Sequence, residues 1–590
     1  MRWKLVPLIV VMIVASSVLA TASQQIFQPP NASPEVRIDR LEAQVEAIES
    51  VRAIKRLQYA YGHYVEYGLW NDFADLFTDD AETNYQQGAR GKSQVRQLFF
   101  DQVGQGKLGL ADGRIYPHIL FQPVITLAPD GRTAKGRWRI LAMLGGIGGS
   151  ATWYSGVYEN QYVLENGVWK ISLLHSESKV TAAYSATGWK DSGAHVPFHF
   201  TSQSVTAPIS STPPRRLNSG GSTATLASLG QRVNQLTLRT SLLNDQAEVT
   251  NLQDNYGYAT DRKLWDQAVS LFAENGTLEL GLQGVYVGKA SIRRGLQQFG
   301  TQGLRDGELN DHVYLQTLVT VAPNGLSAKA RGVELIMSSG PGGSNGELAE
   351  GTFENSFIKQ NGTWKIQSIH FYPRMIVDAA TGWAKNSKPA PGPSREYPPD
   401  RMPTANYEIY PKFSLVPFHF DNPVTGKPPQ YPEGVQTVRT TPSNTSAGAP
   451  AIRTEKDLEA RIAELERRVR VAEAFDAAEN LIGALSYYLD EAPQDVASLY
   501  AHNAHPEAAD RSVFANQTMQ PVIDISPDAK TARIRARQLK PAGVSGGAGS
   551  WIASTLDGQI VFEDGSWKFK TLSSAKVWSA PYPGGWARVP

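Results

Sequence analysis

The sequence of 590 residues contains no cysteine, and this absence removes several kinds of chemistry at once. Without thiols the chain forms no disulfide bond, thiolate metal site or cysteine nucleophile, and no cysteine is available to carry a lipid anchor. An excess of one charge is also lacking, because 57 Lys and Arg residues balance 56 Asp and Glu residues. With a net charge of +1 and no long basic run, the sequence predicts no nucleic-acid binding.

Long apolar runs are scarce, and the one at the N-terminus has the features of an export signal. Arg2 and Lys4 precede an apolar stretch from Leu5 to Leu19, and Ala20-Thr21-Ala22 forms an A-x-A cleavage motif. The stretch is shorter than the roughly 20 residues that cross a bilayer as a helix. We therefore predict a cleaved signal peptide at residues 1–22, no integral membrane span afterwards, and a periplasmic or secreted bacterial protein. The alternative is an uncleaved N-terminal anchor.

A hairpin that occurs three times is the clearest feature that the sequence does contain. Its copies are GVYENQYVLENGVWKISLLH from Gly156, GTFENSFIKQNGTWKIQSIH from Gly351, and the more divergent LDGQIVFEDGSWKFKTLS from Leu556. Each copy has Asn-Gly or Asp-Gly before Trp-Lys, and these dipeptides tolerate the positive φ angles of two-residue hairpin turns. The first two copies end in histidine and the third ends in serine.

The hairpin belongs to a longer internal repeat. We expect repeat 1 at 35–205, repeat 2 at 225–386 and a degenerate repeat 3 at 453–590. The linkers between them, 206–224 and 387–452, are rich in Pro, Ser and Thr and cannot bury enough apolar surface to fold alone. Strand patterns follow helical patterns in each repeat, so the predicted fold class is α+β.

Each repeat opens with apolar residues at heptad spacing, as in Leu458, Ile462, Leu465 and Val469. This spacing predicts a short coiled-coil seam. The sequence leaves three packing modes open for these seams: on one another, on another chain, or on their own domains. In repeat 1 a second helix is expected to follow the seam, carrying Ile54, Leu57, Tyr61 and Val65.

The repeats resemble the SnoaL-like branch of the nuclear transport factor 2-like superfamily, which includes polyketide cyclases and scytalone dehydratase. The resemblance is carried by YGHYVEYGLWNDFADLFTDDAE at 61–82, by YGYATDRKLWDQAVSLFAENGT at 256–277, and by the G-x-W-K-I hairpin. It implies tandem cone-shaped barrels, each a curved antiparallel sheet wrapped around N-terminal helices, with a cavity for a small hydrophobic molecule. The superfamily hosts enzymes and non-catalytic binders alike, so function has to be argued from site residues.

Four kinds of position recur in repeats 1 and 2 and supply the candidate site residues. An acid precedes a Trp, a tyrosine lies five residues before the acid, one histidine begins a long strand, and another ends the hairpin. The candidates are Glu66, Tyr61, His118 and His175 in repeat 1, and Asp261, Tyr256, His312 and His370 in repeat 2. In repeat 3, Asn516 and Ser573 replace the two histidines, and Asp490 is the nearest acid.

The resemblance implies catalytic pairs of Glu66 with His118 and of Asp261 with His312. A carboxylate that orients an imidazole suits proton abstraction next to a carbonyl. The tyrosines would bind the substrate carbonyl, since a hydroxyl can donate to a developing enolate. Strand alternation puts His175 on the face of Trp169 and Ile171, so His175 and His370 are predicted to line the pocket.

We therefore expect a cofactor-independent lyase or isomerase that acts on a small hydrophobic carbonyl or alcohol compound. The alternative is a non-catalytic periplasmic protein that binds small ligands or acts as a scaffold. Two histidines and an acid could also form a facial metal triad, but no tight H-x-H or H-x-E spacing supports one, so no metal or cofactor is predicted. Because domains of this superfamily pair through the outer faces of their sheets, three repeats suggest an internal pseudo-dimer with one free face, and hence self-association.

Overall fold

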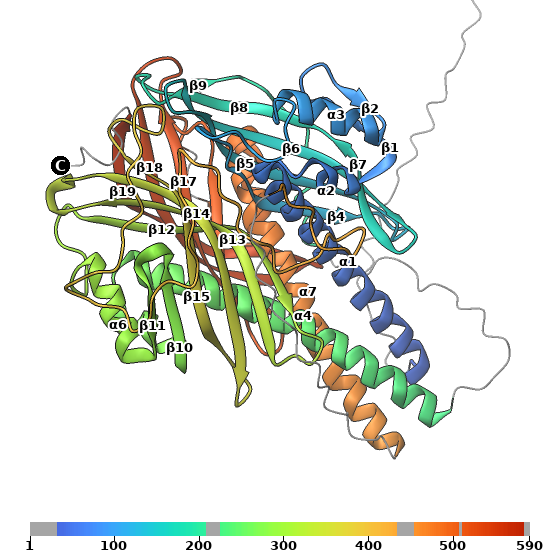
Figure 1. Cartoon of the computed structure of the whole chain (residues 1–590). Helices are drawn as coiled ribbons and strands as arrows, with labels where there is room; N and C mark the ends of the chain where they lie inside the picture. Colours follow the sequence, from blue (N-terminus) through green and yellow to red (C-terminus); the bar gives the residue numbers. More distant parts are fainter. Residues whose placement is uncertain (1–31, 208–224, 434–453, 507–509, 583–590) are drawn as a thin grey trace, which may run out of the picture.

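The computed structural model describes residues 32–207, 225–433, 454–506 and 510–582 (Figure 1). The predicted signal peptide at 1–22 and much of both predicted linkers lie outside the described residues. No helix within these ranges is both long and apolar enough to span a bilayer.

Repeat 1 combines three helices with a nine-stranded sheet. The helices are α1 (Pro34–Tyr67), α2 (Trp70–Asp75) and α3 (Lys92–Gln102). The strands are β1 (Phe77–Thr83), β2 (Ala89–Arg90), β3 (Arg114–Ile115), β4 (His118–Leu127), β5 (Thr133–Gly146), β6 (Ala151–Glu165), β7 (Val168–Leu174), β8 (Ser176–Ala183) and β9 (Lys190–Asp191). The order is β2-β1-β7-β6-β5-β3, with β4 beside β5 and β8 beside β6, and only β1 and β7 run parallel.

Helix α1 shows why the heptad seam and the second helical pattern form one element. It begins at Ser33, whose hydroxyl accepts a hydrogen bond from the Val36 N–H, and it ends at Gly68, which has a φ of 66°. Ser at the N-cap and Gly in the left-handed region at the C-terminus are the preferred ends of a helix. No breaker lies between them, so the two predicted helices are one helix of 34 residues.

Repeat 2 repeats this plan with a six-stranded sheet. Its helices are α4 (Leu226–Asp261), α5 (Trp265–Ser270) and α6 (Lys289–Leu296), and its strands are β10 (Phe272–Leu280), β11 (Val285–Val287), β12 (Leu309–Val321), β13 (Ser327–Ser339), β14 (Glu347–Gln360) and β15 (Thr363–Asp378). Repeat 3 keeps α7 (Glu455–Glu491) and four antiparallel strands, β16 (Gln517–Ile525), β17 (Thr531–Gly543), β18 (Gly549–Glu563) and β19 (Ser566–Tyr582). The α+β fold class is thereby confirmed.

The three hairpins that define the repeat have the predicted turns. Asn166 and Gly167 join β6 to β7, with φ angles of 51° and 82°. Asn361-Gly362 and Asp564-Gly565 occupy the corresponding turns and also have positive φ angles. Two consecutive residues at positive φ are typical of the type I′ turn, which matches the twist of the flanking strands.

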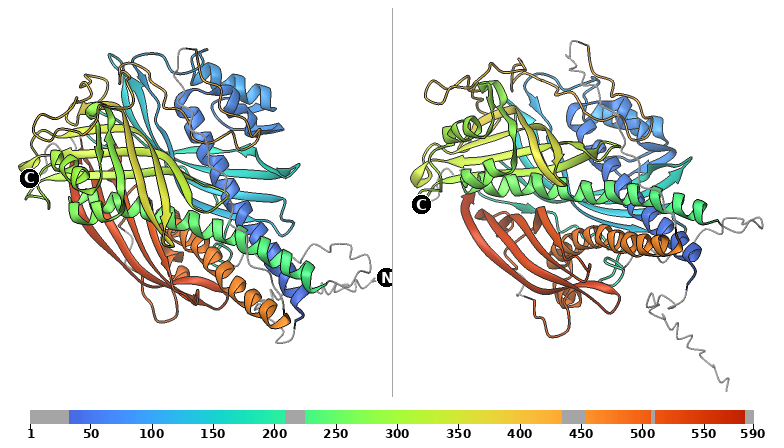
Figure 2. Two further views of the ribbon diagram at one scale, coloured as in Figure 1. Left: turned by 60° about the horizontal axis from the view of Figure 1, so that its bottom comes forward. Right: turned by 90° about the horizontal axis from the view of Figure 1, so that it is seen from below.

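The three sheets share one apolar core. Figure 2 shows the arrangement of the three sheets from below. Side chains from all three sheets form this core, among them Phe121 and Met143 of repeat 1, Leu315 and Leu335 of repeat 2, and Met519 and Leu539 of repeat 3. The expected pseudo-dimer with one free face is therefore wrong, because the third sheet takes part in the same core. Self-association remains a prediction, but it loses this basis.

A ring of three glutamines shows that the repeats are arranged cyclically. Gln316 of repeat 2 accepts the N–H of Leu120 in repeat 1, and Gln520 of repeat 3 accepts the N–H of Tyr314 in repeat 2. Gln122 of repeat 1 closes the ring by accepting a hydrogen bond from the backbone of repeat 3. Each glutamine has a φ between 54° and 57° at a β-bulge, which turns its side chain toward the neighbouring repeat.

The N-terminal halves of α1, α4 and α7 lie side by side and point away from the sheets (Figure 1). Their heptad residues form one buried apolar cluster, which contains Leu41, Val45, Leu229, Val233, Leu458 and Ile462. Of the packing modes expected from the sequence, the helices adopt the one in which the seams contact one another.

The Pro-rich segment after repeat 2 is more ordered than its composition predicts. Residues 387–433, here called the strap, run over repeat 2 and then over repeat 1. The Tyr410 hydroxyl donates to the carbonyl of Trp383, and the Asn422 amide donates to the carbonyl of Asp72 in repeat 1. Tyr410 and Phe420 are buried. A segment that cannot fold alone therefore gains its order from the two repeats that it covers.

Candidate functional site

A cavity of about 160 Å³ lies inside repeat 2, between its helices and the concave face of its sheet. Its wall is mainly apolar, with Leu280, Leu296, Phe299, Ile336, Ile369 and Phe371. Polar side chains also line it, and four of them, Tyr256, His312, Tyr314 and Glu334, lie close together on α4, β12 and β13. An apolar cavity with a few convergent polar groups is the usual form of a small-molecule site.

His312 and Glu334 form a buried pair in this cavity. His312 begins the part of β12 that crosses the cavity, and Glu334 lies on the neighbouring strand β13. His312 Nδ1 lies 2.7 Å from Glu334 Oε1, and His312 Nε2 has no hydrogen-bond partner among the described residues. An ionised Glu334 can only accept, so Nδ1 carries the proton and Nε2 is left with a free lone pair.

Two tyrosines stand beside this pair. Tyr256 on α4 and Tyr314 on β12 pack edge to face, with their ring centroids 6.2 Å apart. Burial and the charge of Glu334 hold the pKa of both phenols well above the usual range. Both hydroxyls therefore stay protonated, and the hydroxyl of Tyr314 interacts with the side chain of Glu334.

Asp261 belongs to this site, but not in the predicted way. Its Oδ1 accepts the backbone N–H of His312 at 2.6 Å instead of binding the ring. Its other oxygen forms an ion pair with Arg537 of repeat 3. The predicted pair between Asp261 and the imidazole of His312 is therefore wrong, and Asp261 positions the start of the strand that carries His312.

Repeat 1 holds its histidine with different partners. His118 Nε2 lies 3.0 Å from the hydroxyl of Tyr158, which is in turn 3.3 Å from the hydroxyl of Tyr61. The ring of Tyr116 stacks on His118. Burial lowers the pKa of His118 to about 3, so this histidine is neutral at ordinary pH. The structure thus brings Tyr61 and His118 together, as predicted.

The predicted pair of Glu66 with His118 is not formed. Glu66 is buried between repeats 1 and 2, where it forms an ion pair with Arg374 of β15. Arg374 also binds Glu350, and burial raises the pKa of Glu350 to about 7. Glu66 is thus part of a contact between two repeats, and the prediction of a catalytic role for it is wrong in this geometry.

His175 and His370 do not line the cavities, and a β-bulge explains why. The register between β6 and β7 places Ile171 and Leu173 opposite adjacent residues, so Ser172 is an extra residue. Gln367 is the extra residue at the same place in repeat 2. A bulge reverses the alternation that follows it, so Leu174 is buried, while His175 turns outward and its ring pairs with Glu177 at 3.2 Å.

His370 follows the same geometry on β15. Its ring lies against Tyr372, with centroids 3.7 Å apart, and its Nδ1 is 3.5 Å from Glu279. Its sequence neighbours Ile369 and Phe371 are the residues that line the cavity. The parity argument was therefore wrong for both hairpin histidines.

The candidate site residues do not form the facial metal triad considered from the sequence. Among the described residues, the group with three ligand atoms within 4.8 Å of one another is His502, Glu563 and Asp564 on repeat 3. Lys568 forms ion pairs with both of these carboxylates, at 3.5 and 3.1 Å. One lysine thus balances one of the two carboxylate charges of this group.

Sequence reasoning missed Glu334, Tyr314 and Arg537. Glu334 has no counterpart in repeat 1, where Ile140 occupies the same register position, so the search for residues shared by both repeats could not find it. Alternation along β13 would have placed Glu334 on the concave face, two residues before Ile336. Arg537 could not be found in this way, because it comes from another repeat.

Comparison with known proteins identifies a family that two regions of the chain match. Residues 46–175 and 241–370 each match the family model of the SnoaL-like domain. No curated protein matches the chain.

Several solved structures are similar to parts of the chain. A putative scytalone dehydratase from Novosphingobium aromaticivorans is 20% identical, with a TM-score of 0.22, over 26% of this chain and 98% of that one. A hexachlorocyclohexane dehydrochlorinase, LinA-type3 from Novosphingobium barchaimii, is 19% identical, with a TM-score of 0.21, over 26% and 98%. A protein of unknown function from Mycobacterium tuberculosis is 18% identical, with a TM-score of 0.18, over 21% and 74%. On the evidence of the two family matches, this chain contains two SnoaL-like domains of the nuclear transport factor 2-like superfamily, one in repeat 1 and one in repeat 2.

Proposed function

We propose that repeat 2 binds a small, mainly apolar molecule and catalyses a cofactor-independent proton transfer, of the lyase or isomerase type. The observation that carries this proposal is the free Nε2 of His312 in a mainly apolar cavity, with Glu334 on the opposite ring nitrogen. This is the arrangement of a general base whose tautomer is set by a carboxylate.

The chemistry begins with a C–H bond next to a carbonyl or a leaving group. His312 Nε2 takes the proton, and the charge of Glu334 stabilises the imidazolium that forms. The hydroxyls of Tyr256 and Tyr314 donate hydrogen bonds to the oxygen on which negative charge develops. The electron pair of the C–H bond then expels the leaving group in an elimination, or the proton returns to another carbon in an isomerisation.

Deuterium exchange tests this step without a known substrate. The purified chain is incubated in D₂O with a panel of small hydrophobic ketones and alcohols, and mass spectrometry follows deuterium incorporation at carbon. We expect exchange with at least one ketone, and a decrease of about 10²-fold or more for His312→Gln and Glu334→Gln. His118→Gln in repeat 1 is the matched control and should leave the rate unchanged. Equal rates for the wild type and both repeat 2 variants would contradict the proposal.

For repeat 1 we propose ligand binding without turnover, which retains the binding-protein alternative for that domain. The observation that favours it is the absence of a carboxylate from the ring of His118, whose contacts among the described residues are tyrosines. A histidine whose pKa is about 3 is a weak base at neutral pH. Native mass spectrometry of the purified chain should therefore detect a bound ligand that survives in His312→Gln.

We also propose that the chain is exported to the periplasm or secreted, and that the helical seams form a coiled coil. Both proposals rest on the sequence patterns at residues 2–22 and at the starts of the three long helices. N-terminal sequencing of protein from a periplasmic fraction should begin at Ser23. An N-terminus that still begins at Met1 would support a retained anchor instead.

A further inference from the structure

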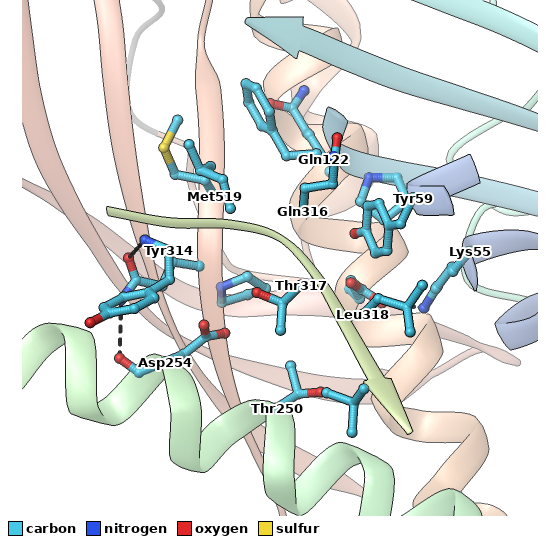
Figure 3. A pocket seen from close by; sticks show the side chains of 18 of the residues that line it. Lys55, Tyr59, Gln122, Thr250, Asp254, Tyr314, Gln316, Thr317, Leu318 and Met519 are labelled. Atoms are coloured by element: carbon cyan, nitrogen blue, oxygen red, sulfur yellow. Dashed lines mark hydrogen bonds and ion pairs between the residues drawn. The ribbon is translucent and has the colours of Figure 1, made fainter. Parts of the chain in front are cut away.

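A second cavity lies where the three repeats meet, outside the cavity of repeat 2. Its volume is about 100 Å³, and its wall combines one face of each long helix, α1, α4 and α7, with the glutamine ring of Gln122, Gln316 and Gln520 (Figure 3). We call it the axial cavity. It exists only in the assembled chain, because each repeat supplies part of the wall.

Two hydrogen-bond acceptors of the wall, a carboxyl group and a hydroxyl group, point into the axial cavity without partners. The carboxyl group of Asp254 on α4 has no hydrogen bond or ion pair to any described residue, although only 3% of Asp254 is exposed. The hydroxyl of Tyr59 on α1 likewise has no hydrogen-bond partner in the described part of the chain. Figure 3 shows the two side chains reaching into the cavity from opposite sides. An unpaired carboxylate in such a place is costly, so it requires a counter-ion or a proton.

The other carboxylates in the wall are already paired. Arg52 and Lys55 of α1 form ion pairs with Asp476 of α7, and Lys55 also pairs with Glu479. The charges of these two cations and two anions balance. Arg56, the remaining cation of the wall, forms no ion pair with a described residue; it lies over the ring of Phe420 in the strap, and its Nε has no hydrogen-bond partner. Among the described residues, Asp254 is therefore the carboxyl group of the wall that no cation contacts directly.

We propose that the axial cavity binds a small primary ammonium ion, with Asp254 as the counter-ion and the hydroxyl oxygen of Tyr59 as a second acceptor. An ammonium group donates three hydrogen bonds and needs acceptors, which these groups supply. A cavity of about 100 Å³ is several times the volume of one water, so it admits an amine of a few carbon atoms. This site is independent of the function proposed for repeat 2.

The protonation of Asp254 in the empty cavity provides a second way to detect binding. Burial and the charge of Glu479 raise the pKa of Asp254 well above its usual value, while Arg537 acts in the opposite direction. A bound cation favours the ionised carboxylate, so any proton that Asp254 holds in the empty cavity must be released when the cation binds. Binding should therefore weaken as the pH is lowered and Asp254 becomes protonated.

Isothermal titration calorimetry of the full chain tests the proposal, with ethylammonium chloride as the probe and ethanol and sodium acetate as neutral and anionic comparators. We expect ethylammonium to bind and the other two not to bind. Asp254→Asn should weaken the binding at least tenfold, and Tyr59→Phe should weaken it less. Glu248→Gln is the matched control, because it removes the same charge from an exposed residue on the same helix.

Several outcomes would overturn the proposal. Acetate binding in preference to ethylammonium would do so, as would unchanged ethylammonium binding in Asp254→Asn. Because Asp254→Asn acts in a core, its circular dichroism and melting temperature are compared with those of the wild type. If it fails to fold, the wild-type titration repeated over a range of pH still decides, since an ethylammonium affinity that does not fall as the pH is lowered contradicts a role for Asp254 as the counter-ion.

Discussion

At the scale of single residues, the same histidine behaves differently in the two SnoaL-like domains because its neighbours on adjacent strands differ. In repeat 2 the neighbour on β13 is Glu334, which holds one ring nitrogen and leaves the other free. In repeat 1 the corresponding position is Ile140, and the partner is Tyr158 on β6. Duplication therefore preserved the histidine while its environment diverged toward different roles.

Arg537 shows how repeat 3 contributes to the site in repeat 2. It forms an ion pair with Asp261 and lies 3.3 Å from Asp311, and both acids are buried. We predict that Arg537→Gln lowers the free energy of unfolding by about 3–5 kcal/mol, because two buried carboxylates lose their cation. Urea denaturation measures this loss.

The control for this change lies two residues away on β17. Arg535 pairs with Asp557 at 2.7 Å, but about half of each side chain is exposed. Arg535→Gln should change the free energy of unfolding by less than about 1 kcal/mol. Equal effects of the two substitutions would show that Arg537 is not part of a buried pair.

Glu350 lies at the interface between repeats 1 and 2 and makes the free energy of unfolding depend on pH. Its folded pKa is raised to about 7, mainly by burial and against the pull of Arg374. In the unfolded chain its pKa is near 4.5, so between pH 4.5 and 7 only the unfolded state has lost the proton. Unfolding is therefore favoured as pH rises through this window, by up to about 3 kcal/mol.

Glu350→Gln tests this dependence, because glutamine cannot ionise. The variant should lose the decline in stability between pH 5 and pH 8 and should be more stable than the wild type at pH 8. Thermal denaturation at both pH values measures the difference. Glu347→Gln on the same strand is the control, since its carboxylate is part of a half-exposed pair with Lys388.

At the scale of elements, the three long helices carry complementary charges where they meet. Arg52, Ala247 and Asp476 occupy equivalent positions of α1, α4 and α7, and Lys55, Thr250 and Glu479 occupy the next ones. Three identical chains would place three like charges together at such positions. The divergence of the repeats replaces that repulsion with ion pairs, which also specify which helix lies beside which.

A double-mutant cycle on Arg52 and Asp476 tests this role. Asp476→Asn should destabilise the chain by about 3–5 kcal/mol, because Arg52 then keeps its buried charge without a full partner. Arg52→Met combined with Asp476→Met should recover much of that loss, since two apolar side chains need no partner. Additive effects of the single substitutions, measured by urea denaturation, would contradict a direct pair.

The strands show how far sequence reasoning reaches. The hairpins, their turns and the α+β class follow from local patterns, and these predictions are confirmed. The placement of His175 and His370 failed because a single extra residue, Ser172 or Gln367, reverses the alternation after it. The recurrence of a glutamine at 122, 316 and 520 was a visible signal, but its meaning depends on contacts between repeats.

The same limit applies to the candidate site. Tyr61, Tyr256, His118 and His312 were candidates for a pocket, and all four are buried inside their domains. Their roles remain predictions. Glu66 and Asp261 were assigned to the histidine rings because their partners, Arg374 and Arg537, lie in other repeats. Ion pairs between residues hundreds of positions apart depend on the assembly and have no local pattern.

At the scale of the whole molecule, segments of one repeat pack over the surface of another. The strap of repeat 2 covers repeat 1, where Phe418 packs against Tyr64. The tail of repeat 1 covers repeat 3, where the hydroxyl of Thr206 donates to the carbonyl of Trp567. Together with the shared core of the three sheets, these crossed segments make the repeats parts of one folding unit instead of independent domains.

Removal of repeat 3 tests whether the three repeats form one folding unit. A chain that ends at residue 453 loses Met519 and Leu539 from the shared core and leaves Asp261 and Asp311 without Arg537. We predict that it exposes a large apolar surface, binds a hydrophobic dye and aggregates, because such a surface is an association site in a soluble protein. Addition of the fragment 454–590 during refolding should restore a compact species of the full mass, as measured by light scattering. A truncated chain that stays monomeric and unfolds cooperatively would show instead that repeats 1 and 2 fold without repeat 3, and that the central core contributes little to their stability.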